Sequence, residues 1–170
     1  PTIHARVGED LYLHGSVASR MLRSATSQTV CFTATIVDGL VIARSAFHHS
    51  MNYRSVVVLG VPRLVEDPVE KVRALDAIVD HVVAGRPHEV RGHHEVEVRT
   101  TRVLALALDE ASVKVRTGGP IDDEEDLAGD AWAGVVPVQQ AFGEPMPADD
   151  LPTAHRTLPP SVVARVASTR

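Results

Sequence analysis

Apolar and polar residues alternate along much of the chain with a period of two, which is typical of half-buried β-strands. The first such run covers residues 1–7, where apolar Ile3 follows polar Thr2 and the alternation continues. Comparable runs predict further strands at residues 11–13, 29–37, 40–47, 53–65, 101–108, 112–116 and 132–138. Short polar turns join most of these runs, so we expect mainly antiparallel pairing.

Two features within these runs predict how the strands are connected. Asp38-Gly39 separates two of them, and this dipeptide favours a two-residue hairpin because both positions tolerate a positive φ angle. The run Val56–Leu59 lacks alternation, which indicates burial on both faces, as inside a barrel or at a dimer interface. Gly60 and Pro62 predict a bulge or bend after it.

One long helix is predicted between Asp67 and Gly85. Asp67 can cap its first turn, Pro68 suits the first helical position, and Glu70 can complete a capping box. Gly85 and Pro87 are expected to end the helix.

Together these elements predict a mostly β, α+β fold: an antiparallel β-barrel with short flanking helices. We expect this domain to cover residues 1–142. Periodicity is lost and prolines recur from Gly143, so residues 143–170 are expected to form a Pro-rich tail that wraps a neighbour or stays loose. The chain starts with Pro1 inside a strand, so we expect the N-terminal part of the domain to be missing from this sequence.

The composition argues against several classes of protein. A net charge of −5 without a basic run disfavours a nucleic-acid-binding protein. No stretch reaches the roughly 18 apolar residues of a membrane span, so we expect no membrane partner. Cys31 is the only cysteine, which rules out a disulfide within the chain and leads us to expect a cytoplasmic location. Its apolar surroundings predict a small buried side chain, not a nucleophile.

The segment Leu11–Arg23, LYLHGSVASRMLR, is the strongest candidate for a binding site. Its strand breaks at His14-Gly15-Ser16, and a short helix that Ser16 or Ser19 can cap follows up to about residue 27. The first turn of a helix leaves N–H groups free and carries a partial positive charge, which suits an anion. Arg20 adds a forked, permanently charged donor that matches a phosphate. We interpret this turn as a phosphate pocket, although an ordinary strand-to-helix connection has the same pattern.

Several histidines are candidates for metal binding. His48 and His49 are adjacent, and neighbouring side chains of a strand point to opposite faces, so one inward and one solvent-facing ring is favoured over a metal site. His93 and His94 lie in a polar stretch without carboxylates or cysteines at ligand spacing, which favours a solvated loop. We therefore predict no metal site, and the sequence nominates no catalytic acid, base or nucleophile.

Three stretches together resemble a known family. They are LYLHGSVASRMLR, DGLVIARSAFHHSMNYRSVVVLG and VRTGGPIDDEEDLAGDAWAGVVP. They resemble the pyridoxamine 5′-phosphate oxidase-like flavin-binding superfamily, and within it the branch of nitroimidazole-resistance-type, flavin-nucleotide-binding proteins. The resemblance extends over roughly residues 1–138. It implies a split β-barrel that forms a homodimer, with two FMN molecules in clefts between the subunits.

The resemblance also implies roles for individual residues. The phosphate contacts fall on Ser16, Ser19 and Arg20, and His14 falls near the isoalloxazine ring or the ribityl chain. Further residues implied in the same cleft are Pro1, Thr2, Ile3, Tyr53, Arg54, Ser55 and Trp132. The Arg-x-Trp pattern expected of true pyridoxamine phosphate oxidases is Asp130-Ala131-Trp132 here, which argues against the vitamin-B6 activity itself.

We therefore expect an FMN-binding oxidoreductase that passes electrons between a reduced donor and a small acceptor such as a nitro-aromatic or a quinone. The alternative is a non-catalytic split-barrel protein that stores or senses a flavin or haem, in which a histidine would serve as an axial ligand. A deazaflavin in the same cleft is a third possibility.

Overall fold

The computed structural model describes residues 2–168, so Pro1, expected in the first strand and the ring pocket, lies outside the described residues. Its strands are β1 (His4–Val7), β2 (Asp10–Ser16), β3 (Val30–Ile42), β4 (Ser50–Gly60), β5 (Arg63–Leu64), β6 (Thr101–Ala107), β7 (Glu110–Arg116) and β8 (Gly134–Pro137). Its α-helices are α1 (Arg20–Ala25), α2 (Pro68–Val82), α3 (Glu95–Thr100) and α4 (Pro160–Ala167). Short 3₁₀ turns are η1 (Ala46–His48), η2 (Arg86–His88), η3 (Asp126–Ala128) and η4 (Thr153–His155). Within residues 2–168, no helix has the length and apolar character needed to cross a bilayer.

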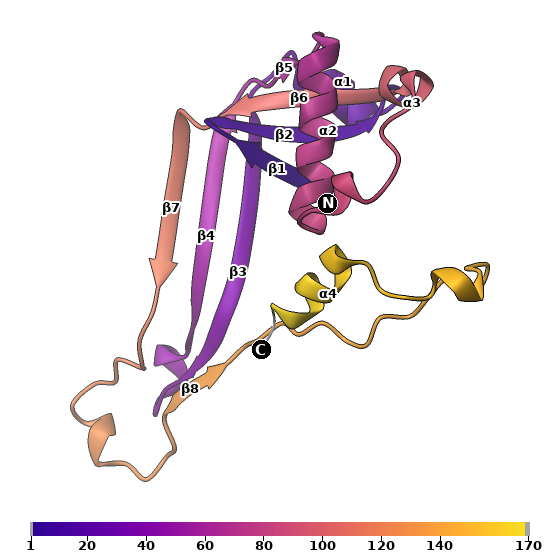
Figure 1. The fold of residues 1–170 in the computed structure, drawn as a ribbon. Coiled ribbons are helices and arrows are strands. Elements are labelled where there is room, and N and C mark those ends of the chain that lie inside the picture. Colours follow the sequence, from indigo (N-terminus) through magenta and orange to yellow (C-terminus); the bar gives the residue numbers. More distant parts are fainter. Residues whose placement is uncertain (1, 169–170) are drawn as a thin grey trace. The chain divides into compact units, whose positions relative to one another are not determined.

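The strands form two four-stranded sheets (Figure 1). Sheet 1 has the order β1-β2-β6-β5 and sheet 2 the order β7-β4-β3-β8, with mainly antiparallel pairing. The chain divides into two compact units. The first unit contains sheet 1 and is built from the described residues up to Val30, Gly60–Asp109 and the segment from Ala141 onward. The second unit contains sheet 2 and is built from Cys31–Leu59 and Glu110–Gln140. This architecture confirms the predicted α+β class.

Helix α2 covers one face of sheet 1. Tyr12 of β2 and Val103 of β6 are buried in one apolar cluster with Ala74 and Ile78 of α2. Burial of each such aliphatic or aromatic side chain contributes on the order of 1.5–3 kcal/mol. The first unit therefore has a hydrophobic core of its own.

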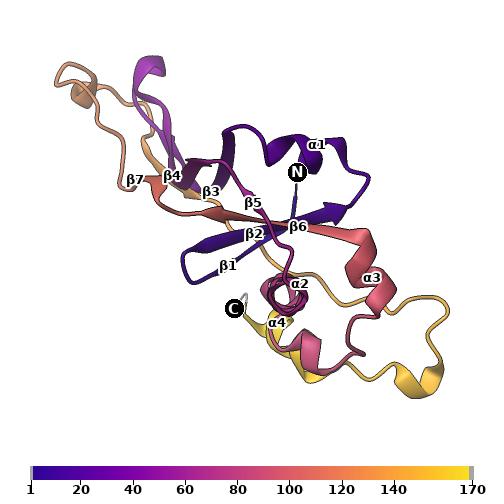
Figure 2. The same ribbon diagram turned by 90° about the horizontal axis from the view of Figure 1, so that it is seen from above.

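Helix α1 lies on the other side of sheet 1 (Figure 2). Leu13 and Leu104 are paired across β2 and β6 and are buried, and strand alternation directs them away from the α2 face. Leu22 of α1 is also buried, and a Cβ added at Gly15 would lie 2.8 Å from its Cδ1. Glycine at this position thus lets α1 pack close to the end of β2.

The long helix begins as the sequence predicts. The carboxylate of Asp67 accepts hydrogen bonds from the N–H groups of Val69 and Glu70 at 3.2 and 3.1 Å, and Pro68 occupies the first turn. The capping box is wrong, because the Glu70 carboxylate instead accepts hydrogen bonds from Tyr12 at 2.7 Å and from Arg63 at 2.6 Å. It therefore joins α2 to sheet 1.

Sheet 2 differs from the prediction at Asp38-Gly39. The expected hairpin is wrong, because β3 runs through this dipeptide without a turn, and Gly39 has no positive φ angle. A Cβ added at Gly39 would lie 3.0 Å from Val135 Cγ1 and 3.3 Å from the Val136 carbonyl oxygen on β8. The glycine thus serves the close approach of β8.

Strand β4 pairs with β7 over Tyr53–Leu59 and ends at Gly60, where the sequence predicts a bend. Within the apolar run, Val58 is 1% exposed while Leu59 is 42% exposed. The expected burial of this run on both faces is therefore incomplete within a single chain.

The predicted Pro-rich tail contains regular secondary structure. It contains α4, whose first turn is anchored by Ser161: the N–H and hydroxyl of this residue donate to the Glu89 carboxylate at 2.9 and 2.5 Å. Both residues belong to the first unit. The His-rich stretch before β6 likewise folds into η2 and α3.

Candidate functional site

The turn between β2 and α1 has the structure expected of a helix N-terminus. Ser19 is the capping residue, and its hydroxyl oxygen accepts a hydrogen bond from the Leu22 N–H at 3.4 Å. The Ser16 hydroxyl accepts from the Ala18 N–H at 3.1 Å, and the Ser16 carbonyl accepts from the Ser19 N–H at 2.9 Å. Both predicted serines therefore shape this turn.

The same turn retains donors for an anion. Each serine hydroxyl acts as an acceptor in these bonds, so its own proton remains available for donation. The Leu22 and Arg23 N–H groups bond to Ser19, which leaves the Arg20 and Met21 N–H groups of the first turn without a partner among the described residues. The Arg20 side chain is exposed and makes no ion pair within residues 2–168. Hydroxyls, backbone N–H groups and a guanidinium are the groups that bind a phosphate.

Thr2 and Ile3 lie close to this turn along sheet 1. They immediately precede β1, whose first residue His4 pairs with Leu13 near the end of β2. Both are exposed. The structure thus places Thr2 and Ile3 at the sheet end from which α1 starts.

His14 has a different environment. It pairs with Val103 across β2 and β6, and alternation directs its ring to the α2 face, whereas the neighbouring Gly15 faces Leu22 of α1. Its Nδ1 is buried and has no hydrogen-bond partner in the described chain. Buried polar atoms usually have a partner, so this nitrogen is a candidate ligand contact. It is separate from the donors of the turn between β2 and α1.

The predicted residues of β4 belong to the second unit. Arg54 donates two hydrogen bonds to the Asp38 carboxylate, at 3.0 Å from Nε and 2.8 Å from an Nη. This pairing lowers the pKa of Asp38 and raises that of Arg54. The Ser55 hydroxyl bonds to Thr35 at 2.8 Å, and Tyr53 pairs with β7. Sequence reasoning missed Asp38 as the partner of Arg54 because it assigned Asp38 to a turn.

Trp132 also belongs to the second unit. Its side chain is 64% exposed, and its ring edge lies against Gly134, where an added Cβ would come within 3.0 Å. An exposed tryptophan is uncommon, and its large apolar ring favours contact with a ligand or a partner.

The structure therefore brings together Thr2, Ile3, Ser16, Ser19 and Arg20 at one end of sheet 1. It places four other candidates in the second unit, where each contacts a different residue: Tyr53, Arg54, Ser55 and Trp132. Their joint participation in one cleft stays a prediction.

The remaining candidates have specific partners. His93 Nε2 lies 3.0 Å from the Asp76 carboxylate of α2, so the expectation of a solvated loop is wrong for this residue. His49 Nδ1 lies 2.9 Å from the Ser45 carbonyl oxygen and His49 is exposed. Cys31 is exposed, which corrects its expected burial.

Comparison with solved structures identifies two close relatives. The flavocytochrome Anf3 from Azotobacter vinelandii is 39% identical with a TM-score of 0.90, covering 96% of this chain and 76% of that chain. The FAD and heme binding protein from Mycobacterium smegmatis is 37% identical with a TM-score of 0.91, covering 96% of this chain and 80% of that chain. A putative 5-nitroimidazole antibiotic resistance protein from Bacteroides thetaiotaomicron is 24% identical with a TM-score of 0.53, covering 66% of this chain and 65% of that chain, and supports the fold alone.

No curated protein matches the chain. The family model described as pyridoxamine 5'-phosphate oxidase matches residues 1–115. The match spans more than half of the chain and includes the turn at α1. The chain belongs to the pyridoxamine 5'-phosphate oxidase family.

Proposed function

We propose that this chain is a flavin-dependent oxidoreductase that binds the phosphate of a flavin nucleotide at the turn between β2 and α1. The observation that carries the proposal is a turn in which the exposed Arg20 has no ion-pair partner within residues 2–168, two serine hydroxyls keep a proton to donate, and two N–H groups have no partner among the described residues. Family membership supports it, because two relatives of 37–39% identity are a flavocytochrome and an FAD- and haem-binding protein.

A bound flavin supplies the redox chemistry, because it can accept a hydride or single electrons and pass them to an acceptor. The residues of this chain have three tasks: to hold the phosphate, to orient the ring and to limit water access. Arg20 neutralises phosphate charge, and the Ser16 and Ser19 hydroxyl protons fix the phosphate oxygens. The donor is a reduced nicotinamide or a similar compound. The acceptor is a small oxidant, with nitro-aromatics and quinones as the first classes to assay.

Flavin titration of matched variants tests the phosphate turn. Arg20→Ala removes a charged hydrogen-bond donor, which costs about 2 kcal/mol and weakens FMN or FAD binding by roughly thirtyfold. Arg23→Ala is the control, because Arg23 is an exposed arginine in the last turn of the same helix. Fluorescence quenching of FMN and of FAD by each protein gives the dissociation constants. Equal affinities for the two variants would refute the pocket.

A second candidate function is electron transfer between a flavin and haem. It is favoured because the two structures that align over 96% of this chain are named for a flavocytochrome and for FAD and haem binding. Haem needs an axial ligand, and His14 has a buried ring nitrogen without a partner in the described chain. A Soret band after haem addition, lost in His14→Ala but retained when exposed His155 is replaced by Ala, would support this function by showing that haem binds through His14. If the wild-type protein gives no Soret band, only the flavin function remains as a proposal.

We also propose that the protein works as a homodimer. Large apolar side chains are exposed throughout the second unit of a single chain, among them Ile36, Leu40, Val113, Val115, Trp132 and Val136. Soluble monomers rarely expose so many apolar side chains in one region. A second copy of the chain, as in the split-barrel resemblance, would cover them.

A further inference from the structure

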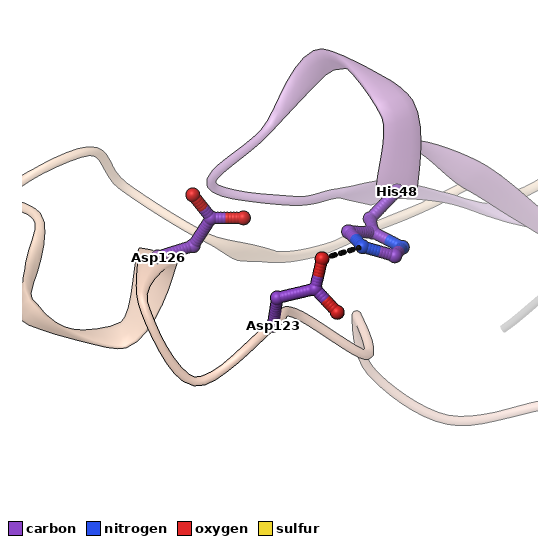
Figure 3. A group of neighbouring side chains, drawn as sticks. All are labelled: His48, Asp123 and Asp126. Carbon is purple, nitrogen blue, oxygen red and sulfur yellow. Dashed lines mark hydrogen bonds and ion pairs between the residues drawn. The ribbon is translucent and has the colours of Figure 1, made fainter.

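Three potential metal ligands meet in the second unit. His48 is the last residue of η1, and Asp123 and Asp126 lie in the acidic segment before and within η3 (Figure 3). One ligand atom from each lies within 4.8 Å of the other two. His48 Nε2 is 3.1 Å from Asp123 Oδ2, and Figure 3 shows the Asp126 carboxylate directed toward this pair from the other side.

A separate interaction holds the two segments together. The Arg44 N–H donates to Asp122 Oδ1 at 2.8 Å, and the Arg44 guanidinium donates to Asp122 Oδ2 at 2.7 Å. The Asp122 side chain is 1% exposed. The Asp126 N–H donates to the Asp123 carbonyl at 3.0 Å and closes the acidic turn. Contacts of Arg44, Asp122 and the backbone thus help to hold the two segments together without using the candidate ligand atoms.

The charges at this cluster are not balanced. Asp123 and Asp126 present two carboxylates to each other, and like charges at this separation repel. Arg44 is engaged by Asp122, and within residues 2–168 the ion-pair partner of these two carboxylates is His48, which lies against Asp123. One imidazole cannot balance the charges of two carboxylates. A divalent cation between the three groups would remove the repulsion.

We propose that His48, Asp123 and Asp126 form a binding site for a first-row divalent transition metal ion, of the class of Zn²⁺, Co²⁺ or Mn²⁺. One imidazole nitrogen with two carboxylate oxygens suits these borderline ions, whereas Ca²⁺ and Mg²⁺ prefer sites made of oxygen alone. Three protein ligands leave a coordination position for water or a small anion. This site uses none of the residues proposed above for flavin phosphate, so the proposal stands independently of them.

Titration of the full-length protein with Co²⁺ tests the site directly. We expect saturable binding of one ion per chain, with a visible absorption band that Zn²⁺ displaces. His48→Ala and Asp126→Asn each remove one ligand and are expected to weaken Co²⁺ binding by at least about tenfold. Asp130→Asn is the matched control, since it makes the same charge change at an exposed aspartate four residues beyond Asp126, and it is expected to bind as the wild type does. Circular dichroism and thermal unfolding check that each variant is folded.

Four results would overturn the proposal. The first is a wild-type protein that shows no saturable Co²⁺ binding. The second is a folded His48→Ala variant with wild-type affinity, which would mean that the ion sits on surface carboxylates only. The third is Ca²⁺ binding as tight as Co²⁺ binding. The fourth is a His48→Ala variant that loses a haem Soret band while its Co²⁺ affinity is unchanged, which would assign this imidazole to haem.

Discussion

The two units of this protein bury their apolar side chains to very different extents. In the first unit, sheet 1 is covered by α2 on one face and α1 on the other, and residues such as Tyr12, Ile78 and Val103 are almost fully buried. In the second unit, few apolar side chains of the described residues are buried. Val41 and Val58 are among them. The first unit thus packs its apolar side chains within a single chain, whereas the second leaves many of them exposed.

The difference matches the division of the proposed functions. The first unit contains the turn at α1, where the cap fixes the local geometry of the donors proposed to bind phosphate. The second unit carries the apolar surface, the Arg54–Asp38 pair and the histidine–aspartate cluster.

The largest expected effect is on the core of the first unit. Ile78→Ala should lower the free energy of unfolding by about 2–5 kcal/mol, because it leaves a cavity at a side chain that is 4% exposed. Ile36→Ala at a 52% exposed site of the second unit is the comparison and should cost less than about 0.5 kcal/mol at low protein concentration. Urea unfolding measures both. Similar losses in the two variants would remove the contrast between the units.

The next effect concerns the association of two copies of the chain into the proposed homodimer. Val113 lies in the second unit, and its side chain is 68% exposed in the single chain. We expect Val113→Asp to raise the dimer dissociation constant more than about tenfold, because the dimer would bury an unpaired charge. Val69→Asp on α2, at a side chain that is 76% exposed, is the control. Light scattering after size-exclusion chromatography gives the masses. A wild-type monomer, or a Val113→Asp dimer as tight as the wild type, would contradict the proposed homodimer.

A smaller effect on the free energy of unfolding is expected when one hydroxyl group is removed from each unit. Tyr12→Phe removes a 2.7 Å hydrogen bond to the Glu70 carboxylate beside the core, which should cost about 1–2 kcal/mol in unfolding free energy. Ser55→Ala removes the 2.8 Å hydroxyl contact with Thr35 in the second unit and should cost about 0.5 kcal/mol or less, because water can replace that contact. Chemical denaturation at neutral pH measures both. A larger loss for Ser55→Ala would show that the second unit is more tightly packed than the single chain indicates.

The smallest effect is the acid sensitivity of one ion pair in each unit. The Arg91 guanidinium and the His94 N–H lower the pKa of Glu97 in the first unit to about 2. The folded pKa lies below the unfolded one, so this stabilisation is complete above pH 4.5 and is lost as the pH falls toward 2. The Arg44 N–H and guanidinium lower the pKa of Asp122 in the second unit in the same direction.

Glu97→Gln should therefore flatten the dependence of stability on pH between 4.5 and 2. Thermal unfolding of this variant and the wild type across that range is the measurement. Parallel profiles would show that Glu97 has the same pKa in the folded and unfolded states.

The sequence predicted elements whose signals are local. Helix α2 was predictable because its limits depend on local interactions: the Asp67 side chain caps the first turn, Pro68 suits that turn, and Gly85 follows the last turn with a positive φ angle. Family membership was predictable because three separated stretches match together. The turn at Ser19 was predictable because capping is also a local interaction.

The rest depends on contacts between distant residues. Asp38-Gly39 has the pattern of a hairpin, but β8 approaches Gly39 closely and Arg54 binds Asp38, so the dipeptide stays within a strand. Glu70 has the spacing of a capping box, but Tyr12 and Arg63 compete for its carboxylate. The partner of each side chain comes from another part of the chain, which local sequence patterns do not specify.

The candidate sites show the same limit. The sequence identified Arg20 from its place in a first helical turn, but it did not reveal that the ring of His14 is directed to the opposite face of sheet 1. No local pattern in the acidic segment at Asp122 indicates its partners, and only the fold shows that Arg44 buries Asp122 and that Asp123 and Asp126 face His48.

We propose that this chain binds a flavin, and the absorbance spectrum of the purified protein after incubation with FMN or FAD and removal of the excess tests this most directly. We expect two flavin bands, in the near-UV and the blue, at about one flavin per chain, with retention strongly reduced in Arg20→Ala and unchanged in Arg23→Ala. A folded wild-type protein that retains neither flavin would refute flavin binding.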